Sequence, residues 1–468
     1  MLQLEHGALE ARRPGRRRSG EPTGPRQGPQ PLRERRTHRL LTWINAARAP
    51  ARHDATMNQI ERERDVVVIG AGPAGLTLAC ALADIGLGVT VLEQQPAAPI
   101  EAPADDGREI AVTHRARAIM ERLGLWRALP ADAIAPLREA CVLDGDRTQA
   151  LRFAARAKSD GPLGWLIPNH HIRAAALAAA RARPGIRLRC DARVAGLELG
   201  ARRARVTLAD GEPVEAALAV AADSRFSQTR RLAGIGASMR DFGRSVIVAC
   251  MAHDKPHDAT AWECFRYGNT LALLPMRGER SSVVLTVSSD AAARWLAMDD
   301  AEFGARVTDQ AGERLGRMRL AGKRHHYPLV GAYAHRFVAQ RFALIGDAAV
   351  GMHPVTAHGW NFGLYGVEVL ARELGAALAR GHDVGAPAAL AAYERAHRRA
   401  TWPIYMGTNA LVALFTDDRA PARFARQAVL DAATRLPGVN GLVQSLVVRQ
   451  LVGDAGRRSS PSSEGALS

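Results

Sequence analysis

The stretch DVVVIGAGPAGLTLACALADIGLGVTVLE, residues 65–93, decides the fold of this chain. Two short runs that are almost wholly apolar, 65–69 and 89–92, flank an apolar segment from about Pro73 to Asp84. Apolar runs of this length are typical of strands in a parallel sheet that is covered on both faces. The stretch therefore predicts a β-α-β unit, with the helix between two parallel strands.

Three glycines join the first strand of this unit to its helix. Gly70 permits the tight turn, Gly72 lets the backbone approach a pyrophosphate, and Gly75 lets the helix pack on the strand. Ala74 lies in the first helical turn, where free N–H groups favour a phosphate. Glu93, at the end of the second strand, is placed to accept hydrogen bonds from ribose hydroxyls. The segment therefore predicts a dinucleotide site.

A second segment, GDAAVGMHPVTAHGWNFG at residues 346–363, follows another buried run at 342–345. It resembles the second flavin motif of the class A flavoprotein monooxygenases, the para-hydroxybenzoate hydroxylase-like group. The resemblance implies that the dinucleotide is FAD, that Asp347 holds its ribityl chain, and that the helix start lies against the flavin ring. The residues that it implicates in FAD binding are Gly346, Asp347, Pro354, Gly359, Trp360 and Asn361.

Two further segments are partial matches to the same group. The segment ADSRFS at 222–227 resembles the Asp-Gly motif between FAD and the nicotinamide donor, which implicates Asp223 and NAD(P)H. Ser224 replaces the glycine and must tolerate the backbone conformation that glycine normally supplies. The segment 107–115 resembles the arginine-bearing segment beside the cofactor, so Arg108 or Arg115 is expected to contact FAD. Ordinary surface arginines are the alternative.

The sequence lacks the residues that other cofactor and metal sites would need. The sequence shows no second nucleotide-binding unit and no Cys-x-x-Cys, so NAD(P)H is expected to bind transiently over the FAD site. The five cysteines lie far apart and indicate no disulfide framework. The histidine pairs 170–171 and 325–326 are expected to point apart on strands, and no third ligand has suitable spacing, so no metal site is predicted.

The net charge of +16 is concentrated partly at the N-terminus. Residues 1–56 hold twelve arginines against five acidic residues and are predicted to be disordered. A transit peptide, a nucleic-acid arm, and a start codon placed too far upstream all stay open, and the last, with Met57 as the true start, is favoured. No basic stripe follows this tail, so no nucleic-acid partner is expected.

The predicted fold class is α/β, a Rossmann-like FAD-binding domain of the glutathione-reductase-2 type with an inserted β-sheet substrate domain and a helical C-terminus. We expect a helix at 172–183, a β-meander at 187–220, a helix at 361–380 and a helix break at Pro403. The expected regions are a tail at 1–56, a first FAD-binding segment at 57–160, a mixed region at 161–235, the substrate sheet at 236–335, a second FAD-binding segment at 336–400, and C-terminal helices with a disordered end at 401–468.

Within the monooxygenase group, residues 65–407 resemble most the hydroxylases of ubiquinone biosynthesis. The segment LGWLIPNHHIR at 163–173 and the His-Pro and Gly-x-Asn-x-Gly elements after Gly346 carry this resemblance. The chain departs from the pattern at Gly366, where aspartate is usual. It also has Thr-Ala-His at 356–358 in place of Gly-Gln, which resembles a subgroup of 5-demethoxyubiquinol hydroxylases.

The resemblance implies an enzyme that uses FAD, NAD(P)H and O₂ to hydroxylate the ring of a polyprenyl phenol or quinol through a C4a-hydroperoxyflavin. His358, one residue before the helix start, is expected to line the junction of flavin and substrate as a catalytic residue. Simple packing in the turn is the alternative. The rivals are a hydroxylase of another aromatic compound, a halogenase or geranylgeranyl-type reductase of the same fold, and a non-catalytic FAD-stabilised scaffold.

The expected partners are a lipophilic aromatic substrate, O₂ and other proteins of ubiquinone biosynthesis, in the bacterial cytoplasm. Residues 440–452 place apolar side chains on one helical face. This face is expected to pack on the body of the protein, or to dock on the inner membrane or a partner.

Overall fold

The computed structural model describes residues 65–145, 150–154, 161–266, 268–353 and 359–416, with Arg419, Pro421 and Phe424 as isolated residues. The expectations for the tail 1–56, for Pro354, for His358 and for the segment 440–452 lie outside these residues.

The β-α-β unit forms the centre of a six-stranded sheet. Strand β1 (Val66–Ile69) pairs in parallel with β2 (Val89–Leu92), and α3 (Pro73–Ala83) connects them. The order is β18-β19-β12-β1-β2-β8, and all pairs are parallel except β18 with β19. The other strands are β8 (Ile186–Arg189), β12 (Leu218–Ala221), β18 (Val338–Ala339) and β19 (Phe342–Leu344).

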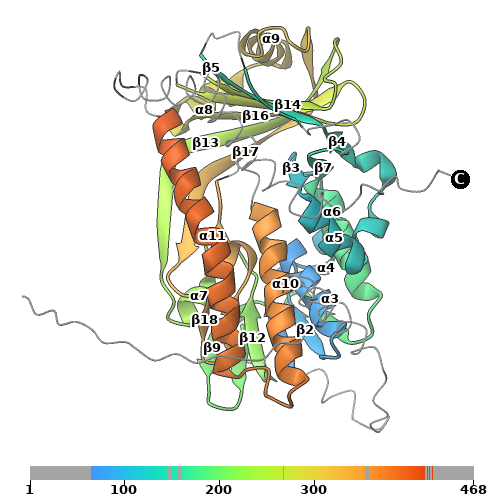
Figure 1. The fold of residues 1–468 in the computed structure, drawn as a ribbon, viewed down its shortest axis with the longest axis vertical. Coiled ribbons are helices and arrows are strands. Elements are labelled where there is room, and N and C mark those ends of the chain that lie inside the picture. The colour runs from blue at the N-terminus through green and yellow to red at the C-terminus, as the bar shows by residue number, and fades with distance from the viewer. Residues whose placement is uncertain are drawn as a thin grey trace, which may run out of the picture. The chain divides into compact units, whose positions relative to one another are not determined.

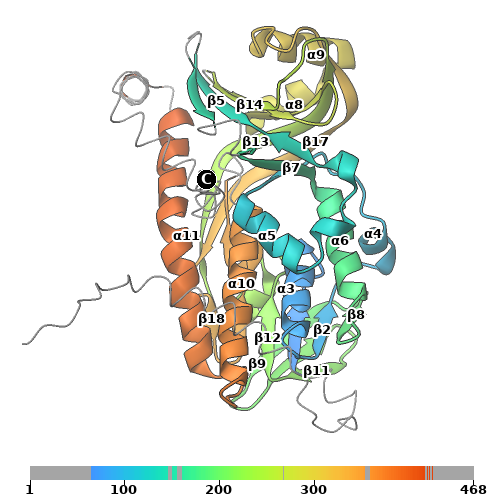
Figure 2. The same cartoon turned by 45° about the vertical axis from the view of Figure 1, so that its right-hand side comes forward.

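The central strands of this sheet are apolar on both faces, and both faces are covered: helices pack on one, and β10 and β11 of a small antiparallel sheet contact β12 and β1 on the other. α3 packs against α6 (Asn169–Arg181) and against α10 (Gly359–Leu378), and α10 packs against α11 (Pro387–Thr416), as Figures 1 and 2 show. Side chains of the strands and helices form the largest hydrophobic core. The shorter helices nearby are α4 (Ala97–Glu101), α5 (His114–Arg122) and α7 (Gln228–Leu232).

The expected meander at 187–220 was wrong at both of its ends. Only β9 (Val194–Leu199), β10 (Ala204–Leu208) and β11 (Pro213–Ala216) form an antiparallel three-stranded sheet. The first and last strands of the predicted meander, β8 and β12, belong to the parallel sheet instead. Alternating sequence in short strands does not show which sheet a strand joins, and β8 pairs with β2 across a crossover.

A second, eight-stranded sheet lies beyond the ends of the parallel strands (Figure 1). Its order is β20-β17-β13-β16-β15-β14-β5-β6. The strands are β5 (Glu139–Asp144), β6 (Leu151–Ala154), β13 (Ala237–His253), β14 (Thr260–Phe265), β15 (Thr270–Pro275), β16 (Arg280–Ser288), β17 (Met318–Ala334) and β20 (Val350–Gly351). Three of them, β5, β6 and β20, come from outside the range expected for the substrate sheet.

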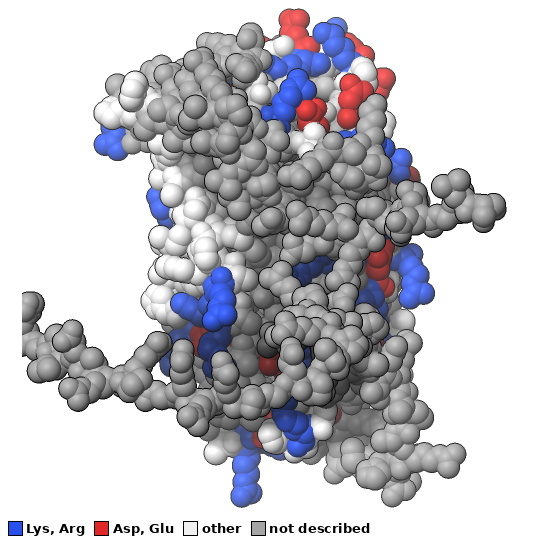
Figure 3. Space-filling model, viewed as in Figure 1, with Lys and Arg blue, Asp and Glu red and all other residues white. Residues whose placement is uncertain are grey.

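One face of this sheet is covered by α8 (Ser289–Ala297) and α9 (Asp300–Gln310), which form a separate core with it. Figure 3 shows acidic and basic side chains mixed on the exterior near α9. Glu302 and Arg306 form an i,i+4 ion pair on this helix. A small three-stranded sheet connects the regions of the two large sheets and consists of β3 (Glu109–Val112), β7 (Gly164–Pro168) and β4 (Ala135–Leu137).

The break expected at Pro403 was wrong, because α11 continues through it. A proline inside a helix removes one backbone hydrogen bond, and packing of the helix can outweigh that loss. Here Tyr405 and Val412 are buried after the proline, which keeps the second half of α11 on the body of the protein. Among the described helices, none combines the length and the apolar character that crossing a bilayer requires.

Candidate active site

Residues of three sequence motifs meet at the carboxyl edge of the parallel sheet. Gly70 follows β1, Glu93 follows β2, Asp223 lies two residues after β12, and Gly346 lies two residues after β19. The Ala222 N–H donates to the Ile69 carbonyl at 2.8 Å, which holds the ends of β12 and β1 together. Ligands of such sheets bind at this edge, where the strand order reverses. The topology thus brings together motifs that are far apart in the sequence.

The three glycines of the first motif are required for different structural reasons. Gly70 has a φ of +108°, and a Cβ there would lie 2.7 Å from the Ala222 carbonyl oxygen. A Cβ on Gly75 would lie 2.0 Å from the Gly70 carbonyl oxygen. A Cβ on Gly72 would meet no described atom within 4 Å. Packing therefore requires Gly70 and Gly75, whereas Gly72 leaves open space before the N-terminus of α3.

Glu93 is fixed at the end of β2. One carboxylate oxygen accepts from the Ala71 N–H at 2.7 Å, and the other accepts from the Gln95 N–H at 2.9 Å. The side chain is buried. Its carboxylate is thereby held beside the glycine turn, as the ribose-binding role requires.

Small residues bring the first and second motifs into contact. Gly346 has a φ of +56°, and a Cβ there would lie 3.0 Å from the Cβ of Ala74. A Cβ on Gly363 would lie 3.7 Å from the Cα of Gly346. The start of α3, the turn after β19 and the start of α10 therefore converge on one point.

The Asp-Ser loop is tied to the second motif by two arginines that sequence reasoning left out of the site. Arg225 donates to the Asp347 carboxylate at 2.7 Å and to the Val330 carbonyl at 2.8 Å. The buried Arg230 donates to the Ala348 carbonyl at 2.9 Å, and burial lowers the pKa of its guanidinium. Arg225 lies in the segment 222–227 already recognised as a motif, so a search for cationic partners of Asp347 could have found it, and Arg230 follows three residues after that segment.

Ser224 does not carry the backbone strain expected of it. It is absent from the residues with positive φ, and its Oγ accepts from the Phe226 N–H at 3.1 Å. The serine closes its own turn, so glycine is not required here. In the preceding residue, one carboxylate oxygen of Asp223 accepts from the Thr229 N–H at 3.3 Å, while the other is buried without a partner among the described residues.

The start of α10 is anchored to the segment before α5. The Asn361 side chain accepts from the backbone and hydroxyl of Thr113 at 3.0 Å each, and it donates to the Ala111 carbonyl at 2.8 Å. The indole N–H of Trp360 is buried and has no partner among the described residues. Asn361 therefore positions Gly359 and Trp360, and its own contact with FAD stays a prediction.

The two candidate arginines are both engaged with protein groups. Arg108 donates to Asp106, and its guanidinium lies 5.5 Å from the ring centroid of Tyr327 on β17. Arg115 pairs with Glu368 on α10 at 2.7 Å and lies over the Tyr365 ring. The described contacts of both arginines are with these protein groups, and their contact with FAD stays a prediction.

The structure places one of the two histidine pairs differently from the expectation. His170 and His171 begin α6, with ring centroids 4.1 Å apart, so they do not point apart on a strand. Among the described residues, no group of three or more His, Cys, Asp or Glu side chains could hold a metal ion. His353 is buried against Phe242, and burial beside Arg225 lowers the pKa of its imidazole to about 4.

Gly366 has a packing reason in this chain. A Cβ there would lie 2.7 Å from the ring of His397 on α11. His397 is buried, its Nδ1 lies 2.9 Å from the Tyr393 hydroxyl, and burial lowers its pKa to about 4. The space that a larger residue would occupy on α10 is thus filled by a neutral imidazole.

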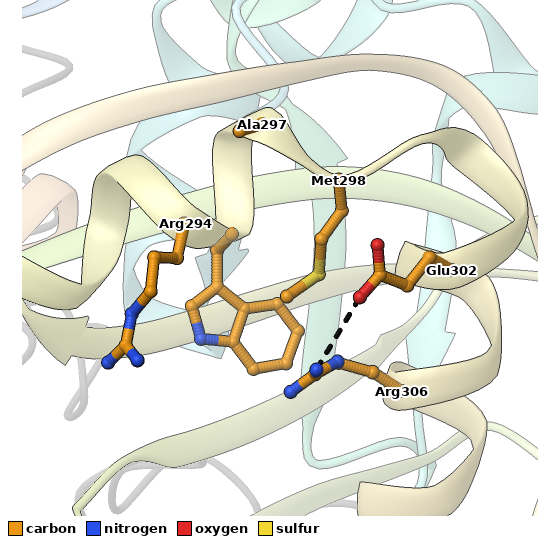
Figure 4. A pocket seen from close by; sticks show the side chains of 6 residues that line it. Arg294, Ala297, Met298, Glu302 and Arg306 are labelled. Atoms are coloured by element: carbon orange, nitrogen blue, oxygen red, sulfur yellow. Dashed lines mark ion pairs between the residues drawn. The ribbon is translucent and has the colours of Figure 1, made fainter.

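A separate pocket lies between α8 and α9, the two helices that cover one face of the eight-stranded sheet (Figure 4). Its lining is Arg294, Trp295, Ala297, Met298, Glu302 and Arg306. It contains none of the residues predicted for cofactor binding.

The residues at the carboxyl edge fit FAD. Gly72 leaves room for a pyrophosphate at a helix N-terminus, and Glu93 offers a fixed carboxylate for a ribose. Asp223 and Trp360 each keep a buried polar atom that no described residue satisfies, which is uncommon unless a ligand does so.

Comparisons with known proteins show the family of this chain. Residues 63–408 match the family described as the FAD binding domain. The chain is 44% identical to ubiquinone hydroxylase UbiM of Neisseria meningitidis, over 83% of this chain and 84% of that protein. It is 36% identical to ubiquinone hydroxylase UbiL of Rhodospirillum rubrum, over 88% and 95%.

Among solved structures, p-nitrophenol 4-monooxygenase PnpA from Pseudomonas putida superposes with a TM-score of 0.66 at 18% identity, over 84% of this chain and 98% of PnpA. This likeness shows the fold, and the sequence matches show the family. The chain belongs to the FAD-dependent class A flavoprotein monooxygenases, in the group that contains the ubiquinone hydroxylases.

Proposed function

We propose that this protein hydroxylates the aromatic ring of a polyprenyl phenol or quinol in ubiquinone biosynthesis, with NAD(P)H and O₂ as co-substrates. The observation that carries the proposal is the convergence of the glycine turn, Glu93, Asp223 and the Gly346 turn at one sheet edge, in a chain 44% identical to a ubiquinone hydroxylase. When bound, FAD supplies the redox chemistry, since it takes electrons from NAD(P)H and delivers them to O₂.

The residues of the chain bind and orient. The N-terminus of α3 and the space at Gly72 would hold the pyrophosphate, and Glu93 would hold the adenosine ribose. Asp347 would accept from the ribityl chain. Arg225 donates both to this carboxylate and to the carbonyl of Val330 on β17, so it links the cofactor site to the substrate sheet.

The face of the eight-stranded sheet away from α8 and α9 carries an apolar surface that suits a lipophilic substrate. Val246, Val248 and Leu329 form a small apolar cluster there, and Phe242 packs against it. Phe242 also meets the buried ring of His353 edge-on at 5.0 Å. An apolar wall beside the flavin would exclude water and receive a polyprenyl tail.

A direct test uses purified protein, NADH or NADPH, and 2-farnesylphenol. We expect the phenol to stimulate NAD(P)H oxidation and to gain one oxygen atom from ¹⁸O₂, as measured by mass. Stimulation by other phenols only would favour a different aromatic substrate. FAD binding with no substrate-stimulated oxidation would favour a scaffold role.

We further propose that His358 lies at the junction of flavin and substrate and that Pro354 contributes to FAD binding. Both histidine and the glutamine that is usual at position 358 donate a hydrogen bond, but only histidine changes charge near neutral pH. His358→Gln should keep FAD content and change the peroxide released per NAD(P)H consumed. If coupling, products and their pH dependence match those of the parent protein, His358 only fills space.

We also propose that the protein works in the bacterial cytoplasm and contacts the inner membrane peripherally. Trp402 and Met406, one turn apart on α11, are 46% and 47% exposed, which is unusual for large apolar side chains. Figure 3 shows few charged side chains over this part of α11. Trp402→Gln with Met406→Gln should weaken binding to anionic lipid vesicles. Equal flotation of variant and parent would argue against this contact.

A further inference from the structure

The eight-stranded sheet presents alternate side chains to two different environments. Ile247, Leu273 and Leu285 belong to the core that contains Trp295 of α8 and Phe303 of α9. Successive side chains of a strand point to opposite faces. The residues between them therefore face away from α8 and α9.

On this opposite face, one row of residues runs across six neighbouring strands in direct register. Glu263 pairs with Val142 on β5 and with Ala272 on β15, which are its neighbours on either side. The row continues through Val284 and Val248 and ends at His325 on β17. It consists of Val142, Glu263, Ala272, Val284, Val248 and His325.

Both ends of this row are covered by the rest of the protein. At one end, a Cβ on Gly107 would lie 2.6 Å from the His325 ring, so His325 touches the segment that carries Arg108. At the other end, Phe265 lies on the same face of β14 as Glu263 and packs in a cluster with Leu414 of α11. The row therefore runs from the segment that carries Arg108 to the C-terminal end of α11.

Glu263 is the one acidic member of the row. Its side chain is half-buried, and it makes no hydrogen bond or ion pair with any residue that the structure describes. Burial alone raises the pKa of its carboxyl to about 8. Two small apolar neighbours, Ala272 and Val284, lie on one side of it. A carboxyl group without a partner destabilises a fold, so its presence in an apolar row suggests a ligand.

We propose that Glu263 binds an oxygen substituent on the aromatic ring of the substrate and thereby orients the ring for hydroxylation. This rests on the proposed function, because the ligand is its phenol or quinol. A carboxyl group can donate to a ring carbonyl and accept from a ring hydroxyl, so it suits a ring that bears either. Ala272, next to it in the row, leaves space for the ring, and the valines continue the surface toward a lipid tail.

The test compares two ligands in four proteins. The ligands are 2-farnesylphenol and farnesylbenzene, which differ only in the ring hydroxyl. The FAD-loaded proteins are the parent, Glu263→Gln and Glu263→Leu, with Glu302→Leu on α9 as a matched control on the opposite side of the sheet. Dissociation constants are measured by the change in flavin absorbance and by displacement.

We expect the parent and Glu302→Leu to bind the phenol about tenfold more tightly than the hydrocarbon. Glu263→Gln should keep most of this preference, since an amide also donates and accepts. Glu263→Leu should reduce it to about one, with unchanged FAD content and no loss of thermal stability. A merely structural glutamate would instead give an unstable leucine variant that keeps the preference.

The failures are distinguishable. If the parent prefers the phenol and Glu263→Leu keeps that preference, the role of Glu263 is overturned while the proposed function stands. If the parent binds neither ligand, the proposed function fails, and the role of Glu263 fails with it.

Discussion

The nucleotide-binding edge and the eight-stranded sheet build their sites in different ways. At the edge, the turn at Gly70, Gly72 and Gly75 offers backbone and empty space at the end of a strand. On the sheet, the chemistry lies in side chains such as Glu263, which is aligned with its neighbours only by strand register. A site made of backbone and empty space is expected to tolerate almost no change of residue. A site made of side chains is expected to change its ligand specificity with one substitution.

The comparison is tested most strongly at the glycine turn. Gly72→Val should fold normally and lose FAD, because its Cβ would meet no described atom within 4 Å and its side chain would occupy the space expected for the pyrophosphate. Gly75→Val should lose both fold and FAD, since its Cβ would lie 2.0 Å from a carbonyl oxygen. Flavin absorbance and circular dichroism report the two effects. Full flavin content in folded Gly72→Val would show that the phosphate binds elsewhere.

The second prediction concerns a side chain at the same edge. Asp347→Ala should weaken FAD binding by roughly 1.5–3 kcal/mol, because a ribityl hydroxyl loses a charged acceptor. Arg225→Ala should have a smaller effect on affinity, since it leaves the carboxylate in place. Titration of apoprotein with FAD measures both. Unchanged affinity and reduction rate in Asp347→Ala would refute the role of this carboxylate.

The third prediction concerns a glycine that serves packing alone. Gly366→Ala should destabilise the protein by about 1–3 kcal/mol, although alanine is the better helix former, because the added Cβ meets the His397 ring at 2.7 Å. Gly407→Ala on α11 is the control, since its Cβ meets no described atom within 4 Å. That variant should be neutral or slightly more stable. Denaturant unfolding measures both, and equal behaviour of the two would contradict the packing account.

Much of the nucleotide-binding region was predictable from sequence. The β-α-β unit was confirmed, because apolar runs and glycine spacing are local signals. The segment 346–363 identified FAD by resemblance. The assignment of β8 and β12 to the parallel sheet was not predictable, since pairing depends on crossovers. Ser224 was misjudged, because its side chain closes the turn that glycine would otherwise allow.

The Glu263 row could not be found from sequence. Val142 and His325 stand at its two ends, although nearly the whole substrate region separates them in the chain. A lone glutamate in a strand, next to a tryptophan, is usually interpreted as a solvent-facing residue. Only the strand register and the side on which α8 and α9 pack show that Glu263 lies on the opposite face of the sheet.

The smallest predicted effect is the pH dependence of stability at Glu263. The carboxyl has a pKa raised from 4.5 to about 8 in the folded protein, so the folded state binds its proton more tightly than the unfolded state. Its contribution to stability is full below about pH 4.5 and is lost as the pH rises through about 8. Glu263→Leu should therefore gain on the order of 1 kcal/mol between about pH 5 and about pH 9 relative to the parent. Parallel stability curves across this range would show that the carboxyl is ionised normally.

We expect the FAD edge and the apolar sheet face to act together in the hydroxylation of a ubiquinone precursor. The most direct measurement is complementation of bacterial strains that each lack one ubiquinone hydroxylase, with quinones identified by mass. We expect this protein to restore ubiquinone in at least one strain, and Gly72→Val to leave the unhydroxylated precursor in place. Accumulation of that precursor in every strain, despite full expression of an FAD-loaded protein, would contradict the account.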